Sequence, residues 1–182
     1  MTTRPADDVS AEPCSSWPRV EGVPEAEQAE RAADPLEARK KAMDYLARRE
    51  YGQKELSAKL VASGFDEPTA LSAVGQLTLD GLQDDRRFVD NFIQSRVQQG
   101  KGPVRIRLEL GQRGMDETLV YEVLNERDDD WESLAKNVRR GKFGAEEPRD
   151  FREKARQMRF LEYRGFTHDQ IHAAVEAVRD HE

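Results

Sequence analysis

The sequence contains little cysteine and no long apolar run. Its 182 residues include one cysteine, Cys14, so the chain can form neither an internal disulfide nor a zinc site built from cysteines. No stretch approaches the roughly 20 consecutive apolar residues that cross a bilayer, and the N-terminus lacks the positive start and apolar stretch of a signal peptide. We therefore expect a soluble, cytoplasmic protein without redox chemistry.

The chain also lacks an excess of basic residues. Lysine and arginine number 29 against 36 aspartates and glutamates, so the formal net charge is -7 and the isoelectric point is about 5.2. This balance argues against an autonomous nucleic-acid-binding protein, because such domains are usually strongly basic. Charged residues make up 36% of the chain, above the roughly 25% of an average globular domain, which favours thin, well-solvated elements over one thick core.

Acidic residues and prolines are concentrated at the N-terminus. Residues 1–38 carry three basic and nine acidic side chains, and five of the eight prolines lie there. Large apolar residues are scarce in this stretch, so burial could not offset the entropy of ordering it. We expect 1–35 to be a disordered acidic tail, although Trp17 and Val20 could form a short docking motif.

From Leu36 onward the apolar residues recur with helical spacing, and we find no alternating pattern of the kind that strands show. One such face consists of Val89, Phe92, Ile93 and Val97. Glycine and proline interrupt the pattern at intervals, and Pro103 and Pro148 suit the first turns of helices, where a missing N–H costs nothing. The sequence predicts an all-α fold of about nine short helices.

Three segments superpose with a glycine in register. Gly64, Gly114 and Gly165 lie 50 and 51 residues apart, which indicates an internal threefold repeat. A further helix is expected before each copy, over 38–50, 85–99 and 130–141. We therefore predict three tandem three-helix repeats of about 50 residues in an elongated array. The boundaries of the repeats are 36–82, 83–128 and 129–182.

Each copy places the same residue types around its glycine. A leucine precedes the glycine by four positions, an apolar residue follows it, and a polar residue comes next. This order predicts a helix that ends on a left-handed glycine, an apolar plug, and a cap that opens the next helix. We expect Leu60, Leu110 and Leu161 to be buried at equivalent places. Trp131 should be largely buried where the second and third repeats meet.

Residues that could support catalysis or bind a metal form weak patterns. His168 and His172 have the i, i+4 spacing of a shared metal site, but no cysteine lies nearby and few carboxylates could complete the shell. Asp84 and Asp85 stand just before an expected helix, where capping is favoured over acid–base chemistry. We predict no enzyme activity, no cofactor and no metal.

The strongest functional signal is a local excess of positive charge. Segment 136–164 contains ten basic and five acidic residues in an otherwise acidic chain. Four of its arginines recur at helical spacing: Arg149, Arg152, Arg156 and Arg159. They would form a stripe able to bind carboxylates or phosphates; the alternative is a solvated helix face with Glu153 as an internal partner. Aromatic residues interleave this cluster in a way that fits base stacking, but core packing is favoured.

A second basic group surrounds the turn at residues 100–103, where some members should pair with acids of the same chain. The residues that we predict to bind a partner come from both groups. They are Arg96, Lys101, Arg105, Arg139, Arg140, Lys142, Arg149, Arg152, Arg156, Arg159 and Arg164.

Four motifs give the chain a close resemblance to the RecX family of bacterial regulators: GLQDDRRFVDNFIQSR, GKGPVRIRLELGQRGMD, DWESLAKNVRRGKFG and QMRFLEYRGF. The resemblance covers residues 38–180 and all three repeats in their order, and the acidic tail lies outside it. Two positions depart from the family pattern. Gly52 stands where the family often has a capping serine, and Gln83 replaces a residue that is usually apolar, so we expect Gln83 at a surface.

This resemblance implies an all-helical modulator of the RecA recombinase, without an active site. The modulator would lie along the groove of the RecA filament and suppress filament growth, ATP hydrolysis, strand exchange and co-protease activity. A sequence-independent DNA-binding module that acts without RecA is the alternative. The expected partners are the RecA filament and single- or double-stranded DNA, with no membrane, and the chain is expected to be a monomer.

Overall fold

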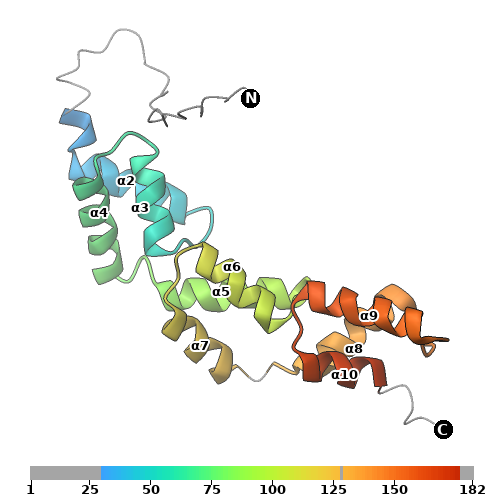
Figure 1. The fold of residues 1–182 in the computed structure, drawn as a ribbon. Helices are drawn as coiled ribbons and strands as arrows, with labels where there is room; N and C mark the ends of the chain where they lie inside the picture. Colours follow the sequence, from blue (N-terminus) through green and yellow to red (C-terminus); the bar gives the residue numbers. More distant parts are fainter. Residues whose placement is uncertain (1–29, 128, 177–182) are drawn as a thin grey trace, which may run out of the picture.

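The computed structural model describes residues 30–127 and 129–176, and within these ranges the chain forms helices and no strand. The helices are α2 (Pro35–Leu46), α3 (Gln53–Val61), α4 (Glu67–Leu79), α5 (Asp85–Gln98), α6 (Pro103–Gln112), α7 (Glu117–Glu126), α8 (Trp131–Phe143), α9 (Phe151–Arg164) and α10 (His168–Glu176). They form three modules, α2–α4, α5–α7 and α8–α10, which follow one another in an elongated, bent row (Figure 1). The predicted all-α array of three three-helix units is confirmed.

The same turn joins the second and third helices of every module. Gly64, Gly114 and Gly165 have φ angles of 98°, 76° and 86°, a left-handed conformation that strains any residue with a Cβ. The next residue donates its N–H back to the carbonyl of the leucine five positions earlier, over 3.1 to 3.2 Å in all three modules. This is the hydrogen bond expected where a glycine ends a helix.

A polar side chain then opens the third helix of each module. Asp66 and Asp116 accept hydrogen bonds from the backbone N–H groups three residues later, over 2.7 and 3.0 Å. In the third module Thr167 plays this part, and its own N–H donates to the side chain of Gln170 over 2.9 Å. These bonds satisfy N–H groups that the start of a helix leaves without intrahelical partners.

Each module has its own apolar core. The most closely packed pairs of helices all lie within one module, and the buried apolar side chains form three separate clusters. Leu60, Leu110 and Leu161 are fully buried in them, as the repeat predicts. The protein is thus stabilised module by module, with a narrower contact at each joint.

Two boundaries differ from the sequence prediction. Helix α2 begins at Pro35 rather than at 38, because Asp34 caps it by accepting from the N–H of Leu36 over 2.9 Å. Asp66 also donates its N–H to the carbonyl of Ala32 over 3.0 Å, so residues 30–34 already belong to the first module. The rest of the predicted tail, 1–29, lies outside the described residues.

Trp131 is partly buried, in agreement with the prediction that most of its side chain is covered. The indole packs against the core of the second module, which places it at the expected joint.

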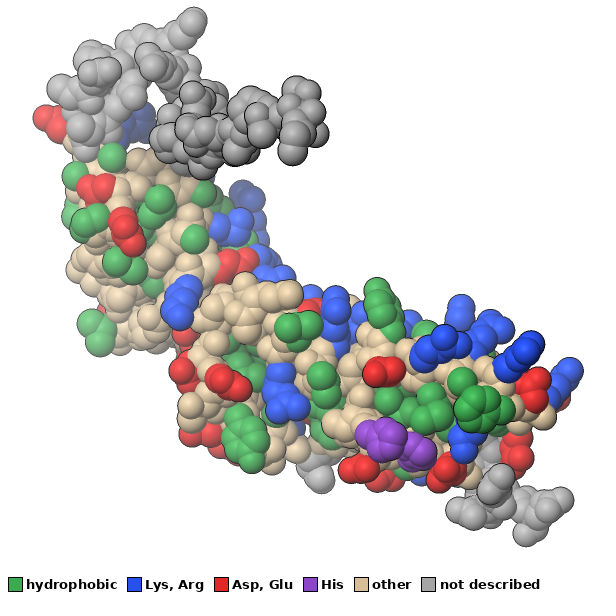
Figure 2. Space-filling view, viewed as in Figure 1, with side chains coloured by type: hydrophobic (Ala, Val, Ile, Leu, Met, Phe, Trp, Pro, Cys, Tyr) green, Lys and Arg blue, Asp and Glu red, His purple; other side chains and the backbone are tan. Residues whose placement is uncertain are grey.

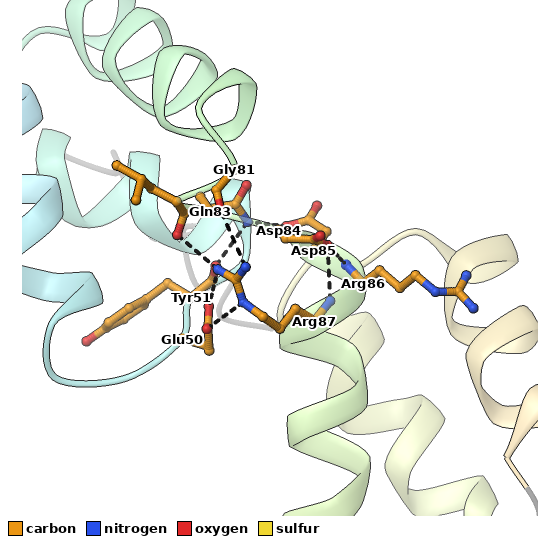
Figure 3. A network of polar contacts seen from close by, with 9 residues as sticks. Glu50, Tyr51, Gly81, Gln83, Asp84, Asp85, Arg86 and Arg87 are labelled. Carbon is orange, nitrogen blue, oxygen red and sulfur yellow. Dashed lines mark hydrogen bonds and ion pairs between the residues drawn. The ribbon is translucent and has the colours of Figure 1, made fainter.

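The joint between the first and second modules is polar. Gln83, which we expected at a surface, is buried, and its side-chain N–H groups donate to the carbonyl of Tyr51 (3.1 Å) and to Asp85 Oδ1 (2.8 Å) (Figure 3). Asp85 Oδ1 also accepts from the N–H of Gln53 over 2.8 Å. This carboxylate from the second module therefore does the capping that Gly52 cannot do for α3.

The joint between the second and third modules is made mainly by backbone. The N–H of Gly102 donates to the carbonyl of Arg164 over 2.9 Å, and the N–H of Val104 donates to the carbonyl of Gly165 over 3.0 Å. Gly102 lies so close to the third-module turn that an added Cβ would collide with the backbone of Gly165 and Phe166. This joint requires glycine for close approach, whereas the first joint relies on side-chain hydrogen bonds.

Among the helices of 30–127 and 129–176, none is long and apolar enough to cross a membrane.

Candidate functional site

The third module carries most of the exposed positive charge that the sequence predicts. Six of the candidate side chains are exposed along the end of α8, the loop after it, and α9: Arg140, Lys142, Arg149, Arg152, Arg156 and Arg159. Figure 2 shows Lys and Arg side chains gathered along one edge of this module. The structure therefore brings these residues of segment 136–164 onto one end of the array.

These cations have few acidic partners. Within the described residues, five of them form no ion pair, and Arg149 lies 3.7 Å from Glu146 with both side chains more than 80% exposed. Glu153, the internal partner that a solvated face would need, instead accepts from the backbone N–H of Arg149 over 2.9 Å. Such a surface keeps its positive charge available for a partner, because exposed and loosely paired charges interact weakly with one another.

The predicted stripe on α9 is shorter than the sequence indicated. Asp150 caps the helix by accepting from the N–H of Glu153 over 2.8 Å, so the helix begins at Phe151. Arg149 precedes the helix, and the helical stripe consists of Arg152, Arg156 and Arg159.

Arg139 cannot contribute to an exposed surface. It is 3% exposed, its Nε donates to Gln157 Oε1 over 2.8 Å, and its Nη2 donates to the carbonyl of Glu146. Burial, together with the charge of Arg140, lowers the pKa of this guanidinium below its ordinary value. The prediction that Arg139 binds a partner is therefore not supported, since its donors hold α8, α9 and the loop between them together.

Most of the candidate basic residues around the turn at residues 100–103 have hydrogen-bond partners within the chain. Glu109 accepts from Arg96 Nε over 2.6 Å and from Arg105 Nε over 2.9 Å. Burial acts to raise the pKa of Glu109, but the two guanidinium hydrogen bonds outweigh it and lower that pKa below its ordinary value. Arg164 donates to the carbonyl of Gln99 over 2.9 Å, across the second joint. Arg96, Arg105 and Arg164 thus have structural partners, and Lys101 is half-exposed beside them.

The aromatic residues near the cations divide into two groups. Phe166 is buried, and Phe160 packs edge-on against Phe143 with 5.3 Å between ring centroids. Phe151 and Tyr163, in contrast, are 83% and 74% exposed. Core packing accounts for the first group, as favoured from the sequence, and the second remains open to a partner.

The two histidines lie close together, and one of them contacts a glutamate of the same helix. The rings of His168 and His172 are 4.3 Å apart between centroids, and Glu176 Oε1 lies 3.4 Å from both His172 Nδ1 and Lys154 Nζ. These two neighbours lower the pKa of Glu176. The described residues contain no group of three or more His, Cys, Asp or Glu side chains able to hold a metal.

The structure also exposes apolar residues that the sequence reasoning did not select. In α6, Ile106 and Leu110 are buried while Val104 and Leu108 are about half exposed. The i, i+4 spacing of Val104 and Leu108, on a different face of α6 from the buried pair, was a signal for a separate apolar surface.

Comparison with known proteins places the whole array in one family. Family models for the first, second and third three-helix domains of RecX match residues 38–77, 84–124 and 128–175. Proteins named Regulatory protein RecX are 45% identical over 136 residues in Halorhodospira halophila, covering 75% of this chain and 84% of the relative, and 42% identical over 137 residues in Pseudomonas entomophila, covering 75% and 88%.

Solved structures share the fold. The crystal structure of RecX from Lactobacillus salivarius superposes with a TM-score of 0.69 at 19% identity, covering 81% of this chain and 97% of that one. A second crystal structure of a regulatory protein RecX gives a TM-score of 0.68 at 20% identity, covering 84% and 74%. With three matched domains in order and relatives above 40% identity, this chain belongs to the RecX family of regulatory proteins.

Proposed function

We propose that this protein regulates RecA by binding the RecA nucleoprotein filament and inhibiting its growth, ATP hydrolysis, strand exchange and co-protease activity. Membership of the RecX family supports RecA as the partner. The observation that carries the proposal on this chain is a set of exposed cations at one end of the array, most of which form no ion pair within 30–127 and 129–176. No enzymatic step is involved, because regulation of this kind needs only differential binding.

The cations suit a polyanionic target. Arg152, Arg156 and Arg159 project from successive turns of α9, and a guanidinium can bind phosphate or carboxylate with two parallel hydrogen bonds. A nucleoprotein filament offers both groups, phosphates from its strand and carboxylates from its protein. The net charge of -7 opposes tight binding to DNA alone, so contacts with the protein of the filament supply the remaining affinity.

The alternative is a sequence-independent DNA-binding module that acts without RecA. The excess of five positive charges in 136–164 favours it locally. Exposed Phe151 and Tyr163 could stack on unpaired bases beside those charges.

Salt titration of binding to single-stranded DNA, with and without RecA, separates the two functions. We expect affinity for naked DNA to be weak and to fall steeply with salt, because it rests on released counterions. Affinity for the RecA filament should be higher and should fall less steeply. Equal affinity and equal salt dependence on naked and RecA-coated DNA would favour the alternative.

A further inference from the structure

Two grooves run along the outer helices of the second and third modules at equivalent places. The groove of the third module, about 1140 Å³, is formed mainly by α9 and α10, and that of the second, about 740 Å³, by α6 and α7. Seven of the eight residues that line the smaller groove have their counterpart, 51 positions later, in the lining of the larger one. The repeat therefore places a groove at the same position in both modules, although the residue types that line it differ.

The two grooves adjoin at the second joint. Val104 lines both of them, and its N–H donates to the carbonyl of Gly165 across the joint, so the two grooves meet at this residue. Apolar side chains are exposed along it: Val104 at 44%, Leu108 at 53% and Phe151 at 83%. Exposed apolar side chains gathered in a groove mark a binding surface more often than scattered ones do.

The charges at the rim of the grooves lack acidic partners. Within the described residues Arg107, Arg152 and Arg159 form no ion pair, and each lines one of the grooves. Over α9 and α10, Figure 2 shows hydrophobic side chains between a ridge of Lys and Arg on one side and the histidines on the other. Over α9 and α10 the surface is thus apolar along its middle and positive along one edge.

We infer that this double groove binds an amphipathic helix of a protein partner, with apolar side chains at i, i+3 or i+4 spacing and acidic residues along the edge that faces the arginines. Under the proposed function, on which this inference rests, the helix belongs to the RecA protein of the filament. The groove, with Arg107, Arg152 and Arg159 in its lining, then recognises protein, while the exposed cations outside it face the phosphates.

Two features favour a helix over a nucleic-acid strand. In the second module the exposed side chains of the groove, Val104 and Leu108, are aliphatic and offer no ring on which a base can stack; Phe151 supplies a ring only in the third module. Each groove also contains one glutamate, Glu117 in the second module and Glu162 in the third, which repels phosphate but tolerates a peptide that carries both signs of charge.

The test replaces the exposed apolar residues with neutral polar ones, so that the charge of the surface is unchanged. Leu108→Gln and Phe151→Gln each remove one anchor, and the double variant removes both. Leu79→Gln is the matched control, since Leu79 is 88% exposed on α4, in the first module and away from both grooves. Circular dichroism checks that the helices of every variant are intact.

Affinity is measured for RecA filaments on single-stranded DNA and, separately, for the same DNA without RecA. Each groove variant should bind the filament about tenfold more weakly, as loss of an interface anchor does, the double variant more weakly still, and the control like wild type. Affinity for naked DNA should not change. Filament affinity of the double variant equal to wild type would overturn the groove assignment and leave the proposed function standing. Equal losses on naked DNA and on the filament would assign the groove to nucleic acid. Absence of filament binding by wild type would overturn both proposals.

Discussion

Arginine plays different structural parts in the first two modules and in the third. In the first two, guanidinium groups are used inside the array: Arg87 pairs with Glu50 over 2.7 Å and Arg113 with Glu55 over 3.0 Å, both across the first joint. In the third, Arg152, Arg156 and Arg159 are exposed and form no ion pair within the described residues. Arg105 and Arg156 are repeat equivalents, yet of the two only Arg105 has an acidic partner in the described part of the chain, Glu109. The side chains around an arginine therefore decide whether it is available to a partner.

The third module also differs from the first two at one repeat position near the joints. Gly52 and Gly102 are repeat equivalents at which the following module packs closely, and a Cβ at either would collide with that module. The third-module equivalent is Glu153, on α9 itself.

All three modules share a buried core leucine, and truncating this leucine should have the largest effect on stability. Leu110→Ala should lower the free energy of unfolding by about 2 to 5 kcal/mol, because it leaves a cavity in a packed interior. Chemical denaturation measures this, and Leu161→Ala should behave alike. A loss below about 1 kcal/mol in either variant would show that the leucines are not equivalent core positions.

Truncation tests the contrast between arginines that form ion pairs within the chain and arginines that are exposed without one. Arg127 donates to Asp90, Gln94 and Asp129, and its hydrogen bonds to the carboxylate of Asp129 raise the pKa of the guanidinium above its ordinary value. Arg127→Ala should cost about 1.5 to 3 kcal/mol, the range for hydrogen bonds between charged groups, whereas Arg156→Ala should stay within about 0.5 kcal/mol of wild type. Urea denaturation measures both variants. Similar losses in the free energy of unfolding would contradict the difference between the two kinds of arginine.

Glycine substitutions distinguish the two joints. Both Gly52 and Gly102 have φ angles that alanine can adopt, -71° and -84°, so only the available space decides. In Gly102→Ala the methyl group meets the backbone of Gly165 and Phe166, which cannot move aside, and about 1 to 3 kcal/mol should be lost. In Gly52→Ala it meets mainly the flexible end of Met115, so the cost should be smaller. Thermal unfolding that ranks the two variants in the opposite order would contradict this reading of the joints.

The smallest expected effect is on the pH dependence of stability. The folded-state pKa of Glu109 is lowered from an ordinary value of 4.5, so the unfolded state binds the proton more readily. The stabilisation is present above that value and is lost as the pH falls through the lowered pKa. Glu109→Gln should therefore unfold with a shallower loss of stability on acidification than wild type, and the exposed Glu122→Gln is its control. An unchanged slope would show that the Arg96 and Arg105 bonds do not hold this carboxylate in its charged form.

The sequence predicted the repeat well, because three signals coincided at each turn. A left-handed glycine, a buried leucine four positions earlier and a polar cap two positions later leave the chain few alternatives at Gly64, Gly114 and Gly165. These are local requirements of backbone and capping, so they can be recognised without knowledge of the packing.

The sequence predicted the candidate surface less well, because exposure depends on how helices pack. Arg139 and Arg140 are adjacent and of one type, yet the first is buried against Gln157 and the second is exposed. Gln83 is polar and buried, since Thr78, Tyr51 and Asp85 satisfy its amide. Neither outcome follows from periodicity, which cannot show where a distant helix supplies a hydrogen-bond partner.

The central claim is that the exposed arginines of the third module act on RecA. The most direct measurement is RecA-dependent ATP hydrolysis on single-stranded DNA, titrated with wild type and with the double variant Arg152→Glu and Arg156→Glu. The control is Lys41→Glu with Arg48→Glu, which changes the net charge equally through exposed residues of the first module. We predict inhibition by wild type and by the control, and clearly weaker inhibition by the third-module variant, with its helical fold intact. Equal inhibition by all three proteins would contradict the role of these arginines, and no inhibition by wild type would contradict the proposed regulation of RecA.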